Sequence, residues 1–204
     1  MQITWHGLNC IRIQGKDVSL ILDPYNENNG PKLPKWQTDI VIASGDNINT
    51  DKGGKEAFVI ENPGEYEIKD VFIYGMQWRK EKGEGSTVLY KIKIDNITIG
   101  FLGGLDRVVP NIALEKLEGV DILILPVGDS ELLSVKDAVE VIARIEPRII
   151  IPTSTSEKGF KKKLENPDKF FQELGKKPEV VEKLKISQKD LPETEQLLYQ
   201  LELS

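Results

Sequence analysis

The 204-residue sequence contains one histidine, His6, and one cysteine, Cys10. Zinc sites in proteins take three or four ligands from histidine, cysteine and carboxylate side chains, so this chain cannot build a pair of zinc ions on histidines. A single cysteine also excludes a disulfide within the chain, and its apolar neighbours favour a buried, inert thiol. His6 lies in a turn between two expected strands, where we expect it to cap or fill the turn.

Long apolar runs and an excess of positive charge are also missing. No apolar run approaches the roughly 18 residues that cross a membrane. The N-terminus lacks the basic start and apolar centre of a signal peptide, which favours a cytoplasmic location. The formal net charge of −6 disfavours contact with nucleic acid, which needs a basic surface. We therefore expect neither a membrane nor a nucleic acid as partner, and a small molecule, another protein or a second copy of the chain remains.

The composition is that of an ordinary globular chain, with 39% hydrophobic and 29% charged residues. At this length we expect one domain over residues 1–204. Alternating strands and turns dominate the first half of the chain, and the pattern predicts a hairpin of strands at 87–94 and 97–102 that turns at Asp95-Asn96. In the second half the pattern predicts helices at 110–119, 134–145 and 160–175, and strands at 120–126, 148–152, 180–186 and 196–203. Two sheets with helical cover, an α/β fold, accommodate this order.

An apolar strand at residues 40–43 leads directly into a polar turn. This segment resembles the first metal motif of the metallo-β-lactamase superfamily, in which Asp-x-Val-x-x-Ser/Thr leads into His-x-His-x-Asp-His. Gly45, Asn47 and Thr50 stand at the three histidine positions of that motif. Asn49 stands at its aspartate position. The segment thus keeps the frame of the motif and has lost its metal ligands.

Other segments resemble the UlaG-like branch of Zn-dependent hydrolases within this superfamily, and the most specific is Pro-Gly-Glu-Tyr-Glu at residues 63–67. Leu8 stands where that branch has a histidine, and Ser154 stands at its last metal histidine. Gly104 replaces the aspartate that bridges two metals, and Phe101 replaces a histidine beside the site. The resemblance implies a metallo-β-lactamase-like four-layer α/β/β/α sandwich, but neither a zinc cofactor nor a catalytic residue.

Two functions fit this pattern. We favour a noncatalytic descendant of the hydrolase fold whose old cleft binds a ligand or a partner, or is packed shut, because Leu8, Gly45, Phe101 and Gly104 offer no side-chain ligand. The alternative is a UlaG-like hydrolase with Mg²⁺ or Mn²⁺ held by oxygen ligands. Its candidate ligands are Asp46, Asn47, Asn49, Asp51 and Asp106.

The oxygen-rich loop after residue 44 lacks the glutamate of an EF-hand, so a solvated, turn-forming cluster is the simpler interpretation. Asp106 follows the bridging position by two residues, so its carboxylate need not reach the same point. A serine hydrolase built on Ser44 or Ser154 is disfavoured, because His6 would have to serve as its base.

Overall fold

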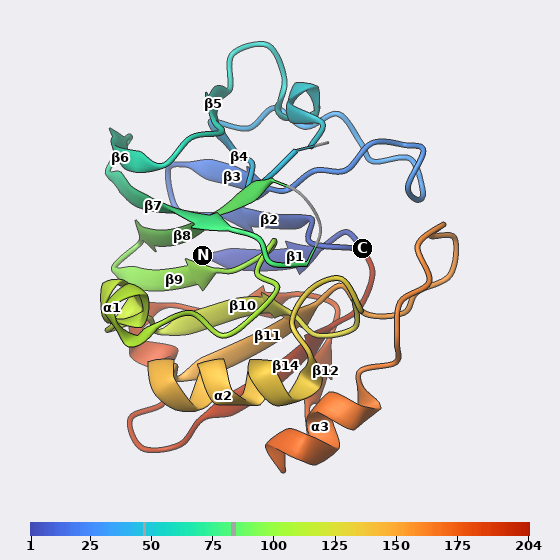
Figure 1. Cartoon of the computed structure of the whole chain (residues 1–204). Helices are drawn as coiled ribbons and strands as arrows, with labels where there is room; N and C mark the ends of the chain where they lie inside the picture. Colours follow the sequence, from blue (N-terminus) through green and yellow to red (C-terminus); the bar gives the residue numbers. More distant parts are fainter. Residues whose placement is uncertain (47, 83–84) are drawn as a thin grey trace.

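The computed structural model describes residues 1–46, 48–82 and 85–204, and two β-sheets dominate it (Figure 1). The six-stranded sheet has the order β13-β1-β2-β3-β4-β5, and the eight-stranded sheet has the order β12-β14-β11-β10-β9-β8-β7-β6. The strands of the first sheet are β1 (Gln2–Trp5), β2 (Ile11–Gln14), β3 (Ser19–Leu22), β4 (Ile40–Ile42), β5 (Phe58–Ile60) and β13 (Leu184–Lys185). Those of the second are β6 (Gly64–Ile68), β7 (Val71–Arg79), β8 (Ser86–Ile94), β9 (Ile97–Phe101), β10 (Ile122–Pro126), β11 (Ile149–Thr153), β12 (Glu179–Val181) and β14 (Leu197–Leu201).

A shared hydrophobic core joins the two sheets face to face. Ile3 and Leu20 of the six-stranded sheet lie in one buried cluster with Ile92, Ile99 and Ile122 of the eight-stranded sheet, and all five are fully buried. Burial of apolar surface at about 25 cal/mol per Å² makes this cluster the main source of stability. The predicted pair of sheets is therefore confirmed.

The outer layers of the two sheets differ. The helices α1 (Asn111–Leu114), α2 (Val135–Ile145) and α3 (Asp168–Leu174) belong to the side of the eight-stranded sheet, where Ala138 and Ile142 pack with Leu123 and Ile150. The outer face of the six-stranded sheet is covered by the loop after β3 and by the short 3₁₀ helix η1 (Thr50–Gly53). The α/β sandwich is confirmed, although one of its helical layers is mostly loop.

Two local predictions are confirmed because their sequence signals are strong. Helix α2 begins after Ser134, whose hydroxyl accepts a hydrogen bond of 3.1 Å from the backbone N–H of Asp137, as expected of a helix N-cap. The β8–β9 hairpin turns at Asp95 and Asn96, whose φ angles of 50° and 61° are left-handed. Asp and Asn tolerate that conformation better than most residues.

Two other predictions are wrong. The helix expected over residues 160–175, with an interruption at Pro167, forms only after that proline, as α3. A backbone bond of 2.8 Å from Glu165 N to Gly128 O draws the preceding segment away from a helical path. The single strand expected over residues 180–186 is two short strands, β12 and β13, in different sheets. Propensity cannot reveal this, because both parts have the composition of a strand.

No helix among residues 1–46, 48–82 and 85–204 is long and apolar enough to cross a membrane.

Candidate functional site

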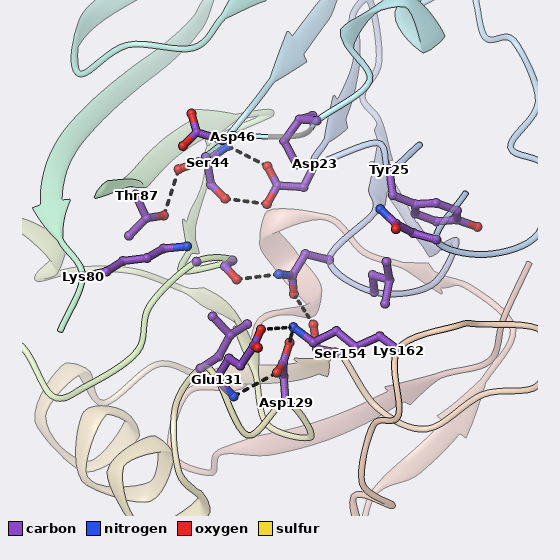
Figure 2. Close-up of a pocket in the computed structure, with 18 of the residues that line it drawn as sticks. Asp23, Tyr25, Ser44, Asp46, Lys80, Thr87, Asp129, Glu131, Ser154 and Lys162 are labelled. Atoms are coloured by element: carbon purple, nitrogen blue, oxygen red, sulfur yellow. Dashed lines mark hydrogen bonds and ion pairs between the residues drawn. The ribbon is translucent and has the colours of Figure 1, made fainter. Parts of the chain in front are cut away.

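A cleft of about 570 Å³ opens where the parallel strands of both sheets end (Figure 2). Asp23 follows β3, Ser44 follows β4, and Ser154 follows β11. Ligand sites of α/β proteins commonly form at such carboxyl ends, because loops from several strands meet there. The residues that line the cleft are Leu8, Asn9, Asp23, Tyr25, Asn29, Ser44, Gly45, Asp46, Ile48, Lys80, Lys82, Thr87, Gly103, Gly104, Asp129, Glu131, Leu132, Ser154 and Lys162.

Asp23 and Ser44 form the upper wall of the cleft in Figure 2. The carboxylate of Asp23 accepts a hydrogen bond of 2.6 Å from the backbone N–H of Ser44 and another from its hydroxyl. The carbonyl of Ser44 accepts a bond of 2.8 Å from the hydroxyl of Thr87. Burial raises the pKa of Asp23 to about 6, against the opposing effect of the Ser44 donors and of Lys80. This carboxyl group therefore changes charge just below neutral pH.

Asn9 joins three loops on the opposite side of the cleft. Its amide nitrogen donates to the carbonyl of Gly103, and its amide oxygen accepts bonds of 2.8 Å from the hydroxyls of Thr153 and Ser154. Ser154 is held in the left-handed region, with φ of 53°, and its backbone N–H donates to the carbonyl of Leu8 at 2.9 Å. These hydrogen bonds connect the β1–β2 turn, the end of β9 and the end of β11.

Lys162 forms an ion-pair cluster at the lower edge of the cleft in Figure 2. Its ammonium lies 2.6 Å from the carboxylate of Asp129 and 2.7 Å from that of Glu131. Burial alone would lower the pKa of Lys162, but its hydrogen bonds to the two carboxylates outweigh burial and raise it. The hydrogen bond from Lys162 lowers the pKa of Glu131. The Lys162 ammonium is thus paired twice, and the cluster of one ammonium and two carboxylates keeps a formal charge of −1.

Five of the ten positions expected at the old metal cleft do line the cleft. They are Leu8, Gly45, Asp46, Gly104 and Ser154. Asn47 lies outside the described residues. The structure brings the remaining four positions to other places, where each has a structural contact.

Phe101 is fully buried in the core between the sheets. Asp106 is also fully buried, and its carboxylate accepts bonds of 2.6 Å from the backbone N–H groups of Glu81 and Lys82. The backbone N–H of Asn49 donates to the carbonyl of Pro24 at 2.6 Å, and Thr50 opens the 3₁₀ helix η1. None of these four residues is among those that line the cleft.

The single histidine and the single cysteine of the chain lie in separate environments. His6 is buried, with its ring nitrogens 3.1 Å from the hydroxyl of Thr4 and 3.1 Å from the carbonyl of Ser204. Burial lowers its pKa, against the opposing effect of the Ser204 carbonyl. Cys10 is fully buried, as expected, and burial raises the pKa of its thiol well above the usual value. Neither residue lines the cleft.

The side chains of the cleft do not suit a pair of zinc ions. Within the described ranges, no group of three or more His, Cys, Asp or Glu side chains is arranged to hold a metal ion. The cleft offers carboxylates as its only such ligands, and Asp23 and Asp129 are already hydrogen-bonded to Ser44 and Lys162. Zinc in catalytic sites takes three protein ligands, usually including histidine.

Several residues that organise the cleft carry no sequence signal of their own. Asn9, Lys80, Thr87 and Lys162 belong to no metal motif and lie far apart in the sequence. Asp23 ends a strand in an Asp-Pro step, which indicates only the strand end. The spacing of Asp23 from the motif at 39–51 is a weak clue that β3 and β4 would be neighbours.

Comparison with known proteins agrees with the fold. A family model described as a β-lactamase superfamily domain matches residues 2–154. A UPF0173 protein of Pyrococcus abyssi is 25% identical, and the match covers 81% of this chain and 91% of the relative. A second UPF0173 protein, from Pyrococcus furiosus, is 22% identical over the same shares of the two chains.

Solved structures show the same architecture. A candidate Zn-dependent hydrolase of the metallo-β-lactamase superfamily from Thermotoga maritima superposes with a TM-score of 0.81 at 24% identity, over 98% of this chain and 97% of that protein. A metallo hydrolase of Ignicoccus hospitalis superposes with a TM-score of 0.66 at 14% identity, over 91% of this chain and 99% of that protein. Because the family model covers most of its length, this chain belongs to the β-lactamase superfamily domain family, within the metallo-β-lactamase superfamily.

Proposed function

We propose that this protein is a noncatalytic member of its superfamily that binds a small polar molecule in the cleft without a metal ion. The observation that carries the proposal is the cleft itself, which remains open with a volume of about 570 Å³. Small-molecule sites commonly have volumes of roughly 300–1,000 Å³ and a few fixed polar groups. A core packed shut would show neither feature.

The hydrogen bonds around the cleft support this proposal. Asp23 with Ser44 and Asn9 with Ser154 hold the loops by direct side-chain contacts, in the region where the metal motif would otherwise lie. A pre-organised site loses less free energy on binding, because its polar groups are already oriented. The replaced positions Leu8, Gly45 and Gly104 supply shape to this site and no coordinating atom.

The alternative, a hydrolase with Mg²⁺ or Mn²⁺ on oxygen ligands, has less support. Such ions need several oxygen ligands that converge on one point. Asp106 is engaged by backbone amides away from the cleft, and Asn49 and Asp51 lie outside it as well. Asp46 is the only one of the described candidate ligands that lines the cleft.

Three narrower statements belong to the same proposal. We infer a relationship to the UlaG-like branch from the Pro-Gly-Glu-Tyr-Glu motif. We also propose that residues 1–204 form one domain and that the protein acts in the cytoplasm. A small molecule is the partner that an open cleft of this size favours, ahead of a protein.

The proposal is tested on protein purified without an affinity tag. We expect elemental analysis to find no stoichiometric transition metal and EDTA to leave the melting temperature unchanged, since the cleft loops are joined by side chains. Phosphodiester, lactone and β-lactam substrates should show no turnover above background. One or more zinc ions per chain, or turnover that EDTA abolishes, would overturn the proposal.

Ligand binding is tested by recording backbone amide NMR spectra during titration with a panel of small metabolites. Amides of Asn9, Ser44 and Ser154 should shift, because they surround the cleft. Gly45→Phe should abolish these shifts by filling the cleft, since the nearest atom to a Cβ at this position is 3.9 Å away. Lys183→Phe, at an exposed residue, is the matched control and should leave binding unchanged.

A further inference from the structure

Three lysines line the cleft, and their ammonium groups are in different situations. Lys162 is paired with Asp129 and Glu131, and the ammonium of Lys82 donates to the carbonyl of Leu132 at 2.7 Å. Lys80 extends into the cleft from the side opposite Tyr25 (Figure 2). Within the part of the chain that the structure describes, no hydrogen-bond or ion-pair acceptor lies against its ammonium.

The backbone that carries Lys80 is firmly held. Lys80 directly follows β7, and its N–H donates to the carbonyl of Gly85 at 3.2 Å. The next two N–H groups, of Glu81 and Lys82, both donate to the buried carboxylate of Asp106 at 2.6 Å. The backbone at Lys80 is therefore already fixed, which favours ligand binding because little backbone ordering is needed.

Arg107 further restrains the backbone around Lys80. Its guanidinium lies 3.4 Å from the carboxylate of Asp106, 3.3 Å from that of Glu81, and 4.7 Å from the ring centre of Trp78. Such cation–π and ion-pair contacts restrict the segment on both sides of Lys80. Asp106, which the sequence offered as a displaced metal ligand, thus holds the backbone next to Lys80.

The charge of Lys80 affects the pKa of a carboxyl group on each wall of the cleft. Burial raises the pKa of Asp23, and the ammonium of Lys80 is one of the groups that oppose this rise. On the other wall, Lys162 has the largest effect on the lowered pKa of Glu131, and Lys80 adds to it. An ammonium that affects carboxylates on both walls lies within the cleft, where less water competes for it than on an open surface.

Three of the four carboxylates that line the cleft, those of Asp23, Asp129 and Glu131, already have hydrogen-bond donors. Asp23 is bonded to Ser44, and Asp129 to Lys162. Asp46 is exposed to water at the rim. Lys80 is therefore the ammonium of the cleft that has no hydrogen-bond or ion-pair partner among the described residues, and an anion would supply one.

We propose that the cleft binds the anionic group of a small molecule, a carboxylate or a phosphate, with Lys80 as its charge partner. This inference rests on the proposed function, since it requires that the cleft be a ligand site. In the proposed complex the ammonium of Lys80 donates a charge-assisted hydrogen bond to the anion. Lys80 thus supplies one of the positive charges that bound metal ions would provide in a catalytic relative.

The test is a titration of the full chain, followed by calorimetry and by amide NMR shifts, with inorganic phosphate, succinate and the neutral sugar glucose. The phosphate and succinate arms distinguish the two anion classes. Lys80→Met is expected to weaken anion binding about tenfold to a hundredfold, the usual effect of losing a charge-assisted hydrogen bond. Lys80→Arg should retain most of the binding, because the positive charge remains.

Lys183→Met is the matched control, since Lys183 is exposed and lies outside the cleft. It should bind as the wild type does, and both Met variants should keep the wild-type melting temperature, because neither lysine has a charged partner among the described residues. If glucose shifts the cleft amides and the anions do not, the anion proposal fails and the proposed function stands. Anion binding that Lys80→Met leaves unchanged also refutes it. If no probe shifts any cleft amide, both proposals fail.

Discussion

The rim of the cleft and the region behind it differ in how they use the positions that the sequence aligned with metal motifs. At the rim, Gly45 and Gly104 carry no side chain, and the space they leave is part of an open cleft. Behind the rim, Phe101 fills the core, and the carboxylate of Asp106 binds two backbone N–H groups. The rim positions are thus free for a ligand, whereas the positions behind it now contribute to folding.

This difference shows that the rim and the region behind it are held together by different contacts. At the rim, Asn9 and Asp23 hold the loops, because each bonds to residues from a different loop. Behind the rim, packing in the core holds Phe101. Substitutions in the two regions should therefore have different effects.

The largest effect is expected behind the rim. Phe101→Ala should lower the free energy of unfolding by about 3–5 kcal/mol, the usual cost of removing a buried phenyl ring. Leu8→Ala at the partly exposed rim should cost well under half of that. Urea denaturation of the two variants measures both values. Equal losses would remove the distinction between the two regions.

A pH-dependent effect is expected from Asp23. Its pKa rises from 3.8 to about 6 in the folded state, so the native protein binds more protons than the unfolded chain between these pH values. Asp23 therefore contributes about 3 kcal/mol to the free energy of unfolding below about pH 4. This contribution is lost as the pH rises through 6. Asp23→Asn should abolish this loss, because an amide does not ionise while its oxygen still accepts from Ser44.

The control for this prediction is Asp39→Asn. Burial would raise the pKa of Asp39, but its bonds to Lys69 and Ser19 outweigh burial and lower it. Asp39 therefore contributes stability at neutral pH that is lost as the pH falls, the reverse of Asp23. Denaturation midpoints should therefore show the Asp23 effect between pH 4 and pH 8 and the Asp39 effect only below pH 3.8, with the opposite dependence on pH.

The smallest effect is expected at the rim glycines. A Cβ at Gly104 would lie 2.1 Å from the hydroxyl oxygen of Thr87, a buried residue that bonds to Ser44. Gly104→Ala should therefore cost about 1–3 kcal/mol by overpacking, whereas Gly45→Ala has open space and should cost little. The melting temperatures of the Gly104→Ala and Gly45→Ala variants measure this difference. A tolerated Gly104→Ala would show that Thr87 can move aside.

The same contact bears on restoring the metal motif. Aspartate at residue 104 meets Thr87 before it can reach a metal, and Ser154 has the left-handed φ of 53°, which strains most side chains. Making Gly45→His, Asn47→His, Asn49→Asp, Thr50→His, Gly104→Asp and Ser154→His together should therefore not restore hydrolysis. Zinc titration of this variant, with turnover assays, is the measurement.

The sequence predicts those parts of the fold whose signals are local. Ser134 and the apolar spacing after it predict α2, and Asp95-Asn96 predicts the β8–β9 hairpin. The motif frame also locates Leu8 and Ser154, although they are separated by most of the chain. Features set by a local pattern, or by the spacing of a known motif, can thus be predicted without a structure.

The interactions that define the cleft could not be predicted, because they are long-range and specific to this chain. Asn9 bonds to residues near 103 and 153, and Lys80 depends on a carboxylate at 106. Polar side chains of this kind occur throughout any sequence, and only tertiary structure determines which of them meet. The scarcity of histidine limits the chemistry of the site, but it does not reveal the hydrogen-bond network of the cleft.

The pairing of β1 with β13 has a consequence for synthesis on the ribosome. Residues 2–3 pair with residues 184–185, so one edge of β1 has no strand partner until nearly the whole chain has been made. An unpaired strand edge readily pairs with other chains. Contacts between such distant residues also slow folding, because a long loop must close first. The edge of β1 that faces β13 therefore stays unpaired through most of translation, and the eight-stranded sheet is also completed late, because β14 follows β13 in the chain.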